Sequence, residues 1–261
     1  MKKILLTGHQ GWIGNAILQD LLRCYSVEDL RLRTFDSGNV SYDQWKEQWH
    51  PFIAEAGVPD LIIHCGANSD SSIDAISAFE SNFRPTVEIA RFCAGYNVNM
   101  IFFSSCAAID PDSPYGFSKY SAEEYIRCDN PESQFCIFRP YNVYGPFEEQ
   151  KKSTSIVHQI RSQTLPFIYG NCVRDFVHIY DVVAAVMQVV RVWRPGIYEL
   201  GTANGTPISH LPVIFGIDKD NFEYKDLCPP SIRPIRVADK DNLLPDWNPV
   251  TIEELYPGVK T

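Results

Sequence analysis

The sequence has a deficit of basic residues and lacks long apolar runs. Its 261 residues include 23 Lys and Arg against 32 Asp and Glu, which gives a formal net charge of −9 at pH 7. A nucleic-acid surface needs clustered basic side chains to neutralise phosphates, so this balance argues against one. No apolar stretch approaches the ~20 residues that span a bilayer, and the N-terminal residues run directly into a strand pattern. We therefore expect a cytoplasmic globular protein with neither a membrane nor a nucleic-acid partner.

Short cysteine and histidine motifs are also absent. The sequence contains eight cysteines without a CxxC pair, and its six histidines form no HExxH motif. Zinc sites and disulfide scaffolds depend on such short, repeated spacings. We predict no metal site and interpret most of the cysteines as small buried apolar residues in a reducing compartment.

Short apolar runs alternate with segments of helical period over the first 139 residues. Strands are predicted at residues 3–7, 30–35, 61–64, 100–104 and 135–139, and helices at 15–23, 44–56, 79–94 and 115–127. Strands that alternate with helices of about ten residues or more form parallel sheets through right-handed crossovers. The predicted fold class is therefore α/β, with a Rossmann-type doubly wound parallel sheet.

This alternation changes after Pro146. The sequence predicts a charged turn at 148–152, helices near 155–163 and 181–192, a short strand around Phe167, and a Pro-rich stretch from Asn204 onward. We predict a dinucleotide-binding core at residues 1–146. Residues 147–261 would form a small C-terminal substrate-binding cap, with a segment at about 170–202 returning to the core.

A glycine-rich turn, TGHQGWIG at residues 7–14, lies between the first predicted strand and helix. Gly8 permits the tight turn, Gly11 lets the backbone approach a pyrophosphate, and Gly14 allows the helix to pack closely on the strand. Glycine turns also join strands to helices for steric reasons alone. The strand before and the helix after, whose N-terminus favours negative charge, nevertheless indicate dinucleotide binding.

Two charged residues near the end of the second strand favour different cofactors. The Asp36 carboxylate can accept hydrogen bonds from the adenosine ribose and would repel a 2′-phosphate, which favours NAD. The Arg33 guanidinium could instead hold the additional phosphate of NADP. Either residue could also be an ordinary solvated strand end, so NAD is preferred and NADP stays open.

Tyr115 and Lys119 lie four residues apart, on one face at the start of a predicted helix. A lysine beside a tyrosine favours the phenolate, so we expect Lys119 to lower the pKa of Tyr115 toward the range that a general acid/base needs. A YxxxK pattern alone occurs by chance in many helices. Combined with the glycine turn, it is far more specific.

The ordered set of motifs resembles the extended short-chain dehydrogenase/reductase superfamily, in the NAD-dependent epimerase/dehydratase family that acts on nucleotide sugars. The motifs that carry this resemblance are TGHQGWIG, LIIHCGA, SNF, SSC, YGFSK, FRPYNVYGP, GNCVRDFVHIYDVV, YELGT and PDWNP. The resemblance covers nearly the whole chain and implies an NAD(P)-dependent enzyme. It also implies a homodimer, formed through the helices at 79–94 and 115–127.

The resemblance assigns roles to individual residues. Tyr115 would be the catalytic acid/base and Lys119 its partner. The residues that would bind the cofactor are Gly8, Gln10, Gly11, Trp12, Ile13, Gly14, Arg33, Asp36, Cys65, Gly66, Ala67, Asn82, Tyr115, Lys119 and Pro140. Those that would contact the substrate diphosphate are Asn142, Arg174 and Arg233, although Asn142 and Arg174 could equally be a turn residue and a surface ion pair.

The sequence departs from the family pattern at the catalytic Ser or Thr. That position falls on Cys106, directly after Ser104 and Ser105, and a thiol is a poor hydrogen-bond donor. Either a shift of one residue brings Ser105 into the catalytic position, or the role is weakened. Ala107 and Ala108 replace an Asp-Glu pair that dehydration needs, so we set that reaction aside. The loop before Tyr115 and the C-terminal cap are also shorter than is usual in the family.

Two classes of function stay open. The first is an NAD(P)-dependent epimerase or 4-keto reductase of a nucleotide-activated sugar, with Tyr115 and Lys119 as acid/base machinery. The alternative is a non-catalytic dinucleotide-binding subunit that regulates a partner enzyme. Cys106 and the shortened loop favour the alternative, whereas the intact Tyr-Lys pair favours the enzyme.

Overall fold

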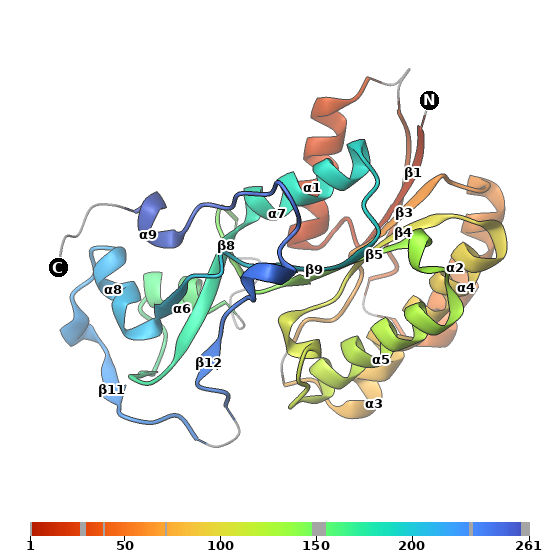
Figure 1. Cartoon of the computed structure of the whole chain (residues 1–261). Helices are drawn as coiled ribbons and strands as arrows, with labels where there is room; N and C mark the ends of the chain where they lie inside the picture. The colour runs from red at the N-terminus through yellow and green to blue at the C-terminus, as the bar shows by residue number, and fades with distance from the viewer. Residues whose placement is uncertain are drawn as a thin grey trace. The chain divides into compact units, whose positions relative to one another are not determined.

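The computed structural model describes residues 2–26, 30–38, 40–70, 72–147, 155–229 and 232–256 (Figure 1). The chain divides into two compact units. The first unit comprises Met1–Arg139 and Val186–Tyr198, and the second comprises Pro140–Ala185 and Glu199–Thr261. The charged turn predicted at 148–152 lies outside the described residues.

A six-stranded sheet forms the centre of the first unit, in the order β2-β1-β3-β4-β5-β9. The strands are β1 (Lys2–Thr7), β2 (Leu30–Phe35), β3 (Leu61–His64), β4 (Asn99–Phe103), β5 (Phe135–Pro140) and β9 (Gly196–Leu200). The pairings from β2 to β5 are all parallel. From β1 the chain passes outward to β2 and then returns to the other side of β1 as β3. Such a switch point, at the carboxyl ends of β1 and β3, is where doubly wound sheets bind ligands. The predicted fold class is confirmed.

Helices connect these strands. They are α1 (Trp12–Cys24), α2 (Tyr42–Ala56), α4 (Arg84–Tyr96), α5 (Pro114–Asp129) and α7 (Ile179–Arg191). Capping residues set several of their ends. Ser41 and Gln44 form a reciprocal capping box at α2, and the Ser113 side chain caps α5. A short helix, α3 (Ala75–Ala78), and a π-helical turn at Phe79–Phe83 lead into α4.

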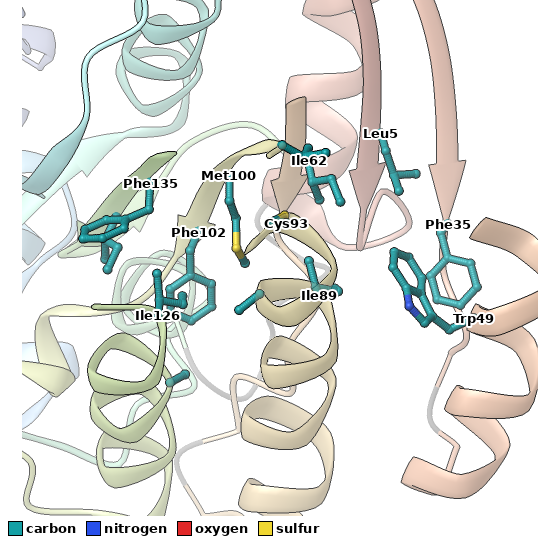
Figure 2. Close-up of a cluster of buried hydrophobic side chains, with 14 of the residues drawn as sticks. Leu5, Phe35, Trp49, Ile62, Ile89, Cys93, Met100, Phe102, Ile126 and Phe135 are labelled. Atoms are coloured by element: carbon teal, nitrogen blue, oxygen red, sulfur yellow. The ribbon is translucent and has the colours of Figure 1, made fainter. Parts of the chain in front are cut away.

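A hydrophobic core of the first unit lies between the sheet and helices α2, α4 and α5 (Figure 2). Successive strand residues point to opposite faces of a sheet, so Leu5, Ile62 and Met100 meet these helices from neighbouring strands. On the α2 side, Trp49 stacks on a second tryptophan and meets the ring of Phe35 edge-on, with centroids 5.3 Å apart. Burial of large aromatic side chains at this position fixes α2 beside β2.

Several short strands build the second unit around β8 (Val173–His178). Its neighbours are β6 (Asn142–Tyr144), β10 (Gly205–Pro207) and β12 (Ile235–Arg236), while β7 (Phe167–Tyr169) pairs separately with β11 (Glu223–Lys225). The helices of this unit include α6 (Ile156–Arg161), α8 (Leu211–Ile214) and α9 (Ile252–Leu255).

A buried carboxylate organises the turns around β8. The Asp175 side chain accepts hydrogen bonds from the backbone N–H groups of Thr202 at 2.7 Å, Ala203 at 2.9 Å and Ala238 at 3.1 Å. Asp175 is fully buried, so these donors replace the water that its charge would otherwise need. A single side chain therefore holds two separate turns of the second unit.

The interpretation of the cysteines as buried apolar residues needs a correction. Cys93, Cys136 and Cys172 are buried, but Cys24 and Cys128 are exposed. The exposed pair lies in the last turns of α1 and α5, where a helix leaves the core. In the described part of the chain, no helix has the length and apolar character to cross a membrane.

Candidate active site

The glycine turn follows β1 with the geometry that its sequence predicts. Gly8 has a φ of +74°, which a glycine adopts without strain, and its N–H donates to the Phe35 carbonyl at 3.0 Å. A Cβ atom on Gly8 would lie 2.4 Å from the backbone nitrogen of Gly66. The turn therefore packs directly on the backbone that follows β3, and no larger residue fits there.

Gly14 allows α1 to begin close to this turn. A Cβ atom at Gly14 would lie only 2.1 Å from the Gly8 carbonyl oxygen. Gly11 precedes the first helical residue, and its N–H donates to the same Gly8 carbonyl at 3.1 Å. The glycines therefore leave the backbone of the turn uncovered where α1 begins. The first N–H groups of a helix have no partner within the helix, and they can bind a phosphate.

Asp36 lies beside the glycine turn. One carboxylate oxygen accepts from the Gln10 N–H at 3.1 Å, and the other accepts from the Gly38 N–H at 3.0 Å. The sequence predicts this carboxylate near a cofactor ribose, and its contact with Gln10 lies within the glycine turn. Arg33 is an exposed residue on β2.

His64, which sequence analysis did not single out, joins the ends of β1 and β3 to α4. Its ring nitrogens contact the hydroxyls of Thr7 at 2.6 Å and Thr86 at 3.0 Å. The Thr86 hydroxyl donates its proton to the Asn82 carbonyl, so it must accept from Nε2–H of His64, and Nδ1 then accepts from Thr7. Burial, together with the charge of Lys119, lowers the pKa of His64 to about 3, so the ring stays neutral.

Asn82 sits in the π-helical turn and is fully buried. Its Oδ1 accepts from the Asn68 N–H at 2.7 Å, and its Nδ2 donates to the Asn68 carbonyl at 3.0 Å and to the Ser118 hydroxyl at 3.2 Å. The structure therefore directs the amide of this predicted cofactor ligand toward the protein. Asn82 ties the loop after β3 to helix α5.

Ser105 and Tyr115 come together at the carboxyl end of β4. The Ser105 oxygen accepts from the Ala107 N–H at 3.1 Å, and the serine side chain acts on the Tyr115 phenol by lowering its pKa. Because the serine oxygen already accepts a backbone proton, its own proton is available to the phenolic oxygen. Of the three residues considered for the catalytic Ser position, Ser105 is the one whose hydroxyl acts on Tyr115, while Cys106 acts on it electrostatically.

The pKa of Tyr115 does not follow the expectation. Burial raises it to about 12, against a smaller lowering by the Ser105 hydrogen bond. The expected lowering by Lys119 is wrong for this structure, because the lysine ammonium points to another partner. Its Nζ donates to the Phe103 carbonyl at 2.8 Å and lies 4.9 Å from the centroid of the Phe102 ring. Burial lowers the pKa of Lys119 to about 8, opposed by Cys65 and Glu123.

Ser104 and Glu123 form a second buried cluster behind this pair. The Ser104 hydroxyl donates to the Glu123 carboxylate. The two carboxylate oxygens also accept from Nε–H of Arg139, at 3.0 and 3.1 Å. Glu123 is fully buried and lies four residues after Lys119 on α5. The cluster therefore joins α5 to the ends of β4 and β5. In the sequence, the position of Glu123 one helical turn beyond the motif YGFSK is the only signal for this cluster.

Gly116 explains how α5 comes so close to Ser105. A Cβ atom on Gly116 would lie 2.7 Å from the backbone carbonyl of Ala107. The helix can therefore start against the turn of residues 106–108 only with glycine at this position. Gly116 belongs to the motif YGFSK, but the spacing of that motif does not indicate this role.

These residues fit a nicotinamide dinucleotide. Glycines leave space at the start of α1, Asp36 supplies a carboxylate beside the same turn, and Tyr115 and Lys119 follow on the same edge of the sheet. The Nδ1 atom of His9, within the turn, is buried and has no hydrogen-bond partner among the described residues. A buried polar atom without a partner is costly, and a ligand group at the turn could supply one.

A comparison with known protein families decides the identity of this arrangement. The model of the NAD dependent epimerase/dehydratase family matches residues 4–201. The chain belongs to this family.

A curated protein and several solved structures are similar to most of the chain. A Methanocaldococcus jannaschii protein, provisionally named a UDP-glucose 4-epimerase, is 26% identical over 245 residues, which cover 80% of this chain and 79% of that protein. A UDP-N-acetylglucosamine 4-epimerase of Methanobrevibacter ruminantium, in complex with UDP-N-acetylmuramic acid, superposes with a TM-score of 0.77 at 20% identity and covers 98% of this chain and 96% of its own. Thermus thermophilus UDP-glucose 4-epimerase with NAD gives 0.74 at 22% identity, with 98% and 100% covered.

The residues that family membership suggests for the substrate lie in the second unit. Asn142, on β6, donates through Nδ2 to the Asp175 carbonyl at 2.9 Å. The Arg174 guanidinium, on β8, donates to the carbonyls of Val173, Arg233 and Pro234, each at 2.9 Å. The structure thus brings Arg174 and the backbone of Arg233 together and fixes the guanidinium among carbonyls. Pro140, the last residue of β5, is buried.

Proposed function

We propose that the chain is an NAD(P)-dependent epimerase or 4-keto reductase of a nucleotide-activated sugar, with Tyr115 as the acid/base. The observation that carries the proposal is the pair of Ser105 and the buried Tyr115 at the end of β4, where the serine lowers the pKa of the phenol, with Lys119 one helical turn further on. This pair lies at the edge of the sheet that also carries the glycine turn and its switch point.

The proposal gives each part of this edge a binding role. The N-terminus of α1 would receive the cofactor pyrophosphate, and Asp36 would accept hydrogen bonds from the adenosine ribose. Lys119 would bind the nicotinamide ribose, beside the loop of Cys65, Gly66 and Ala67. When bound, the nicotinamide accepts or delivers a hydride at a carbon of the sugar.

Tyr115 would move the accompanying proton. With its pKa raised to about 12, the phenol is protonated near neutral pH and is ready to protonate the oxygen of a keto sugar during reduction. In the opposite direction, the phenolate must take a proton from a sugar hydroxyl. The Ser105 hydroxyl, held by its bond from Ala107, stabilises that phenolate by donating to it.

The proposed substrates follow from the chemistry of the second unit and from the relatives' names. Arg174 and Arg233 are suited to a diphosphate, and Asn142 offers a neutral donor. The three relatives carry names of UDP-sugar 4-epimerases. UDP-glucose and UDP-N-acetylglucosamine are therefore the first substrates to test, followed by nucleotide-activated 4-keto sugars with NADH or NADPH.

The test begins with the cofactor of the purified protein. The protein is denatured and the supernatant is chromatographed for nicotinamide nucleotides. Stoichiometric NAD together with epimerisation at C4 of a UDP-sugar supports an epimerase, which regenerates its cofactor in each cycle. Protein without cofactor that oxidises NADH or NADPH only when a 4-keto sugar is present supports a reductase.

Tyr115→Phe then tests the role of the phenol. We expect turnover to fall by roughly 10²–10⁴-fold, the usual contribution of a general acid/base, with dinucleotide binding retained. Tyr120→Phe is the matched control, because Tyr120 is an exposed residue of the same helix. Full turnover by Tyr115→Phe would overturn the acid/base assignment. Dinucleotide binding without turnover on any of these substrates would instead support a non-catalytic subunit.

A further inference from the structure

Two cysteines of the second unit, 56 positions apart in the sequence, occupy equivalent positions beyond a pair of parallel strands. Strands β7 and β11 pair in a register that places Tyr169 opposite Lys225. Cys172 follows Tyr169 by three residues, and Cys228 follows Lys225 by three residues. The strand pairing ends at Tyr169 and Lys225, and a turn closed by the bond from the Cys172 N–H to the Tyr169 carbonyl at 3.3 Å leads to Cys172. The two cysteines therefore follow the ends of two paired strands at equal distances along the chain.

Backbone hydrogen bonds hold the two segments together beyond the paired strands. The Gly170 N–H donates to the Lys225 carbonyl at 2.8 Å, and the Cys228 N–H donates to the Asn171 side chain at 2.9 Å. Cys172 belongs to the buried core of the unit, and Cys228 packs against that core. These contacts place Cys228 beside Asn171, the residue that precedes Cys172.

The two thiols interact within this cluster. Cys228 acts on Cys172 and helps to raise its pKa, and the Cys228 sulfur donates to the Ile232 carbonyl at 3.3 Å. A disulfide requires two cysteines on neighbouring segments whose Cα atoms lie within about 7 Å.

The surroundings of the two thiols differ. Cys172 is 1% exposed, whereas Cys228 is partly accessible to solvent. Burial raises the pKa of Cys172, as does its contact with Cys228, while the Arg174 guanidinium acts in the opposite direction by stabilising the thiolate. Cys228 is therefore the thiol that an external reagent reaches first, and Cys172 is the partner held beside it.

We propose that Cys172 and Cys228 are a reversible dithiol/disulfide pair, oxidised by a low-molecular-weight disulfide such as oxidised glutathione. The Cys228 thiolate attacks one sulfur of the small disulfide, which forms a mixed disulfide and releases one thiolate. Cys172 then attacks the Cys228 sulfur, which closes the protein disulfide and releases the second thiolate. The two cysteines lose two protons to solvent, and the small disulfide takes up two electrons.

The cross-link would act on the chain that supports Arg174. It joins Cys172, which directly precedes β8, to Cys228, four residues before Ile232. The chain near Ile232 and Arg233 already contacts β8 through the bond from the Val173 N–H to the Pro234 carbonyl at 2.8 Å. A disulfide that closes the loop from Cys172 to Cys228 restricts the unfolded chain and thereby stabilises the folded one. A rise in melting temperature of several degrees is expected.

The experiment uses the purified full chain, fully reduced and then incubated with oxidised glutathione. Intact mass spectrometry should show a loss of about 2 Da, the two hydrogens of a dithiol, which dithiothreitol reverses. Peptide mapping without reduction should join the peptides that contain Cys172 and Cys228. A stable mixed disulfide at Cys228 without the cross-link, or a cross-link between other cysteines, would overturn the proposal.

Single substitutions test the order of the two steps. In Cys172→Ala the cross-link should be lost, and one glutathione should stay bound to Cys228. Cys228→Ser keeps the buried Cys172, so it should fold and gain neither the cross-link nor glutathione. Cys24→Ser and Cys128→Ser are matched controls at exposed cysteines and should close the cross-link like the wild type. If glutathione modified Cys172 in Cys228→Ser as much as it modifies Cys228 in Cys172→Ala, the proposed order would be overturned. None of these readouts depends on the enzyme activity.

Discussion

Gly116 shows how a residue without a side chain can position a catalytic group. The space that its Cβ would need is occupied by the Ala107 carbonyl, and Ala107 also donates the hydrogen bond that orients Ser105. A substitution here therefore acts on the spacing between Ser105 and Tyr115 without removing either group.

We predict that Gly116→Ala lowers kcat by roughly tenfold or more, because a misplacement of about 1 Å can cost up to 10²-fold in rate. The measurement is steady-state turnover together with dinucleotide affinity, which should change little because the glycine turn is not involved. Gly95→Ala is the control, since a Cβ atom on that helical glycine meets nothing within 4 Å. Unchanged turnover in Gly116→Ala would show that α5 can move away from residues 106–108 without consequence.

Ser105 and Cys106 can be separated by substitution. We predict that Ser105→Ala lowers kcat by roughly 10–100-fold, because the Tyr115 phenolate loses its donor, whereas Cys106→Ser leaves it nearly unchanged. The comparison of kcat for the two variants checks this prediction. A gain of activity in Cys106→Ser would return the catalytic role to position 106.

Asp36 is the residue at which cofactor choice can be tested. Asp36→Asn keeps oxygen and nitrogen atoms near Gln10 and Gly38 but removes the negative charge. We predict that the Kd for NADP falls by roughly tenfold, which corresponds to about 1.4 kcal/mol of relieved repulsion, while the Kd for NAD rises. Fluorescence titration of both cofactors checks it. An unchanged ratio of the two Kd values would show that Asp36 does not select against the 2′-phosphate.

The sequence predicts the positions of some site residues but not the properties or roles of others. Tyr115, Lys119 and the glycines lie in motifs whose chemistry is local, so their placement follows from spacing. The pKa of Tyr115 could not be predicted, because it depends on the burial of the phenol and on Lys119 pointing to the Phe103 carbonyl. The roles of His64 and Glu123 depend on partners that are far away in the sequence, and no local pattern reports them.

At the scale of secondary structure, prediction succeeds for the strands of the central sheet. The predicted strands at 30–35 and 61–64 agree with β2 and β3 residue for residue. β3 is a continuous buried run, as is typical of a strand covered on both faces, whereas β2 is an edge strand that alternates apolar and arginine residues. Strands of two or three residues, such as β6, β10 and β12, were missed. Such strands are too short for a periodic pattern, and pairing with β8 defines them instead.

Asp175 is the clearest case in which one side chain holds several elements. Asp175→Asn removes the charge that three backbone N–H groups share, and its amide nitrogen would face one of these donors. We predict a loss of about 3 kcal/mol in the free energy of unfolding, and hydrogen exchange should accelerate at Thr202, Ala203 and Ala238. The exposed Asp220→Asn is the control. A loss below about 0.5 kcal/mol, the range of surface substitutions, would contradict this role.

For the molecule as a whole, buried Lys119 makes stability depend on pH. Its pKa is lowered from 10.5 to about 8 in the folded chain, so between these values the unfolded chain binds more protons than the folded one. Stability therefore increases as the pH rises through this window, and the increase is complete above the unfolded pKa.

The corresponding prediction compares the wild type with Lys119→Met, which cannot titrate. Between pH 8 and pH 10, the free energy of unfolding of the wild type should rise relative to that of the variant by about 2 kcal/mol. Chemical denaturation at both pH values checks it, with the exposed Lys240→Met as the control. Parallel pH curves for the wild type and Lys119→Met would mean that Lys119 keeps its ordinary pKa after folding.

The division of the chain also bears on the order in which it can fold during synthesis. The first unit needs Val186–Tyr198 in addition to its first 139 residues, and this late segment includes most of strand β9, the last strand of the sheet. At roughly 5–20 residues per second, a ribosome needs about 3–12 s to add residues 140–198. During that interval the nascent chain carries β5 as an open sheet edge, which is a site for unwanted pairing. Slow codons between positions 139 and 198 would prolong this exposure, whereas slow codons after position 198 would not.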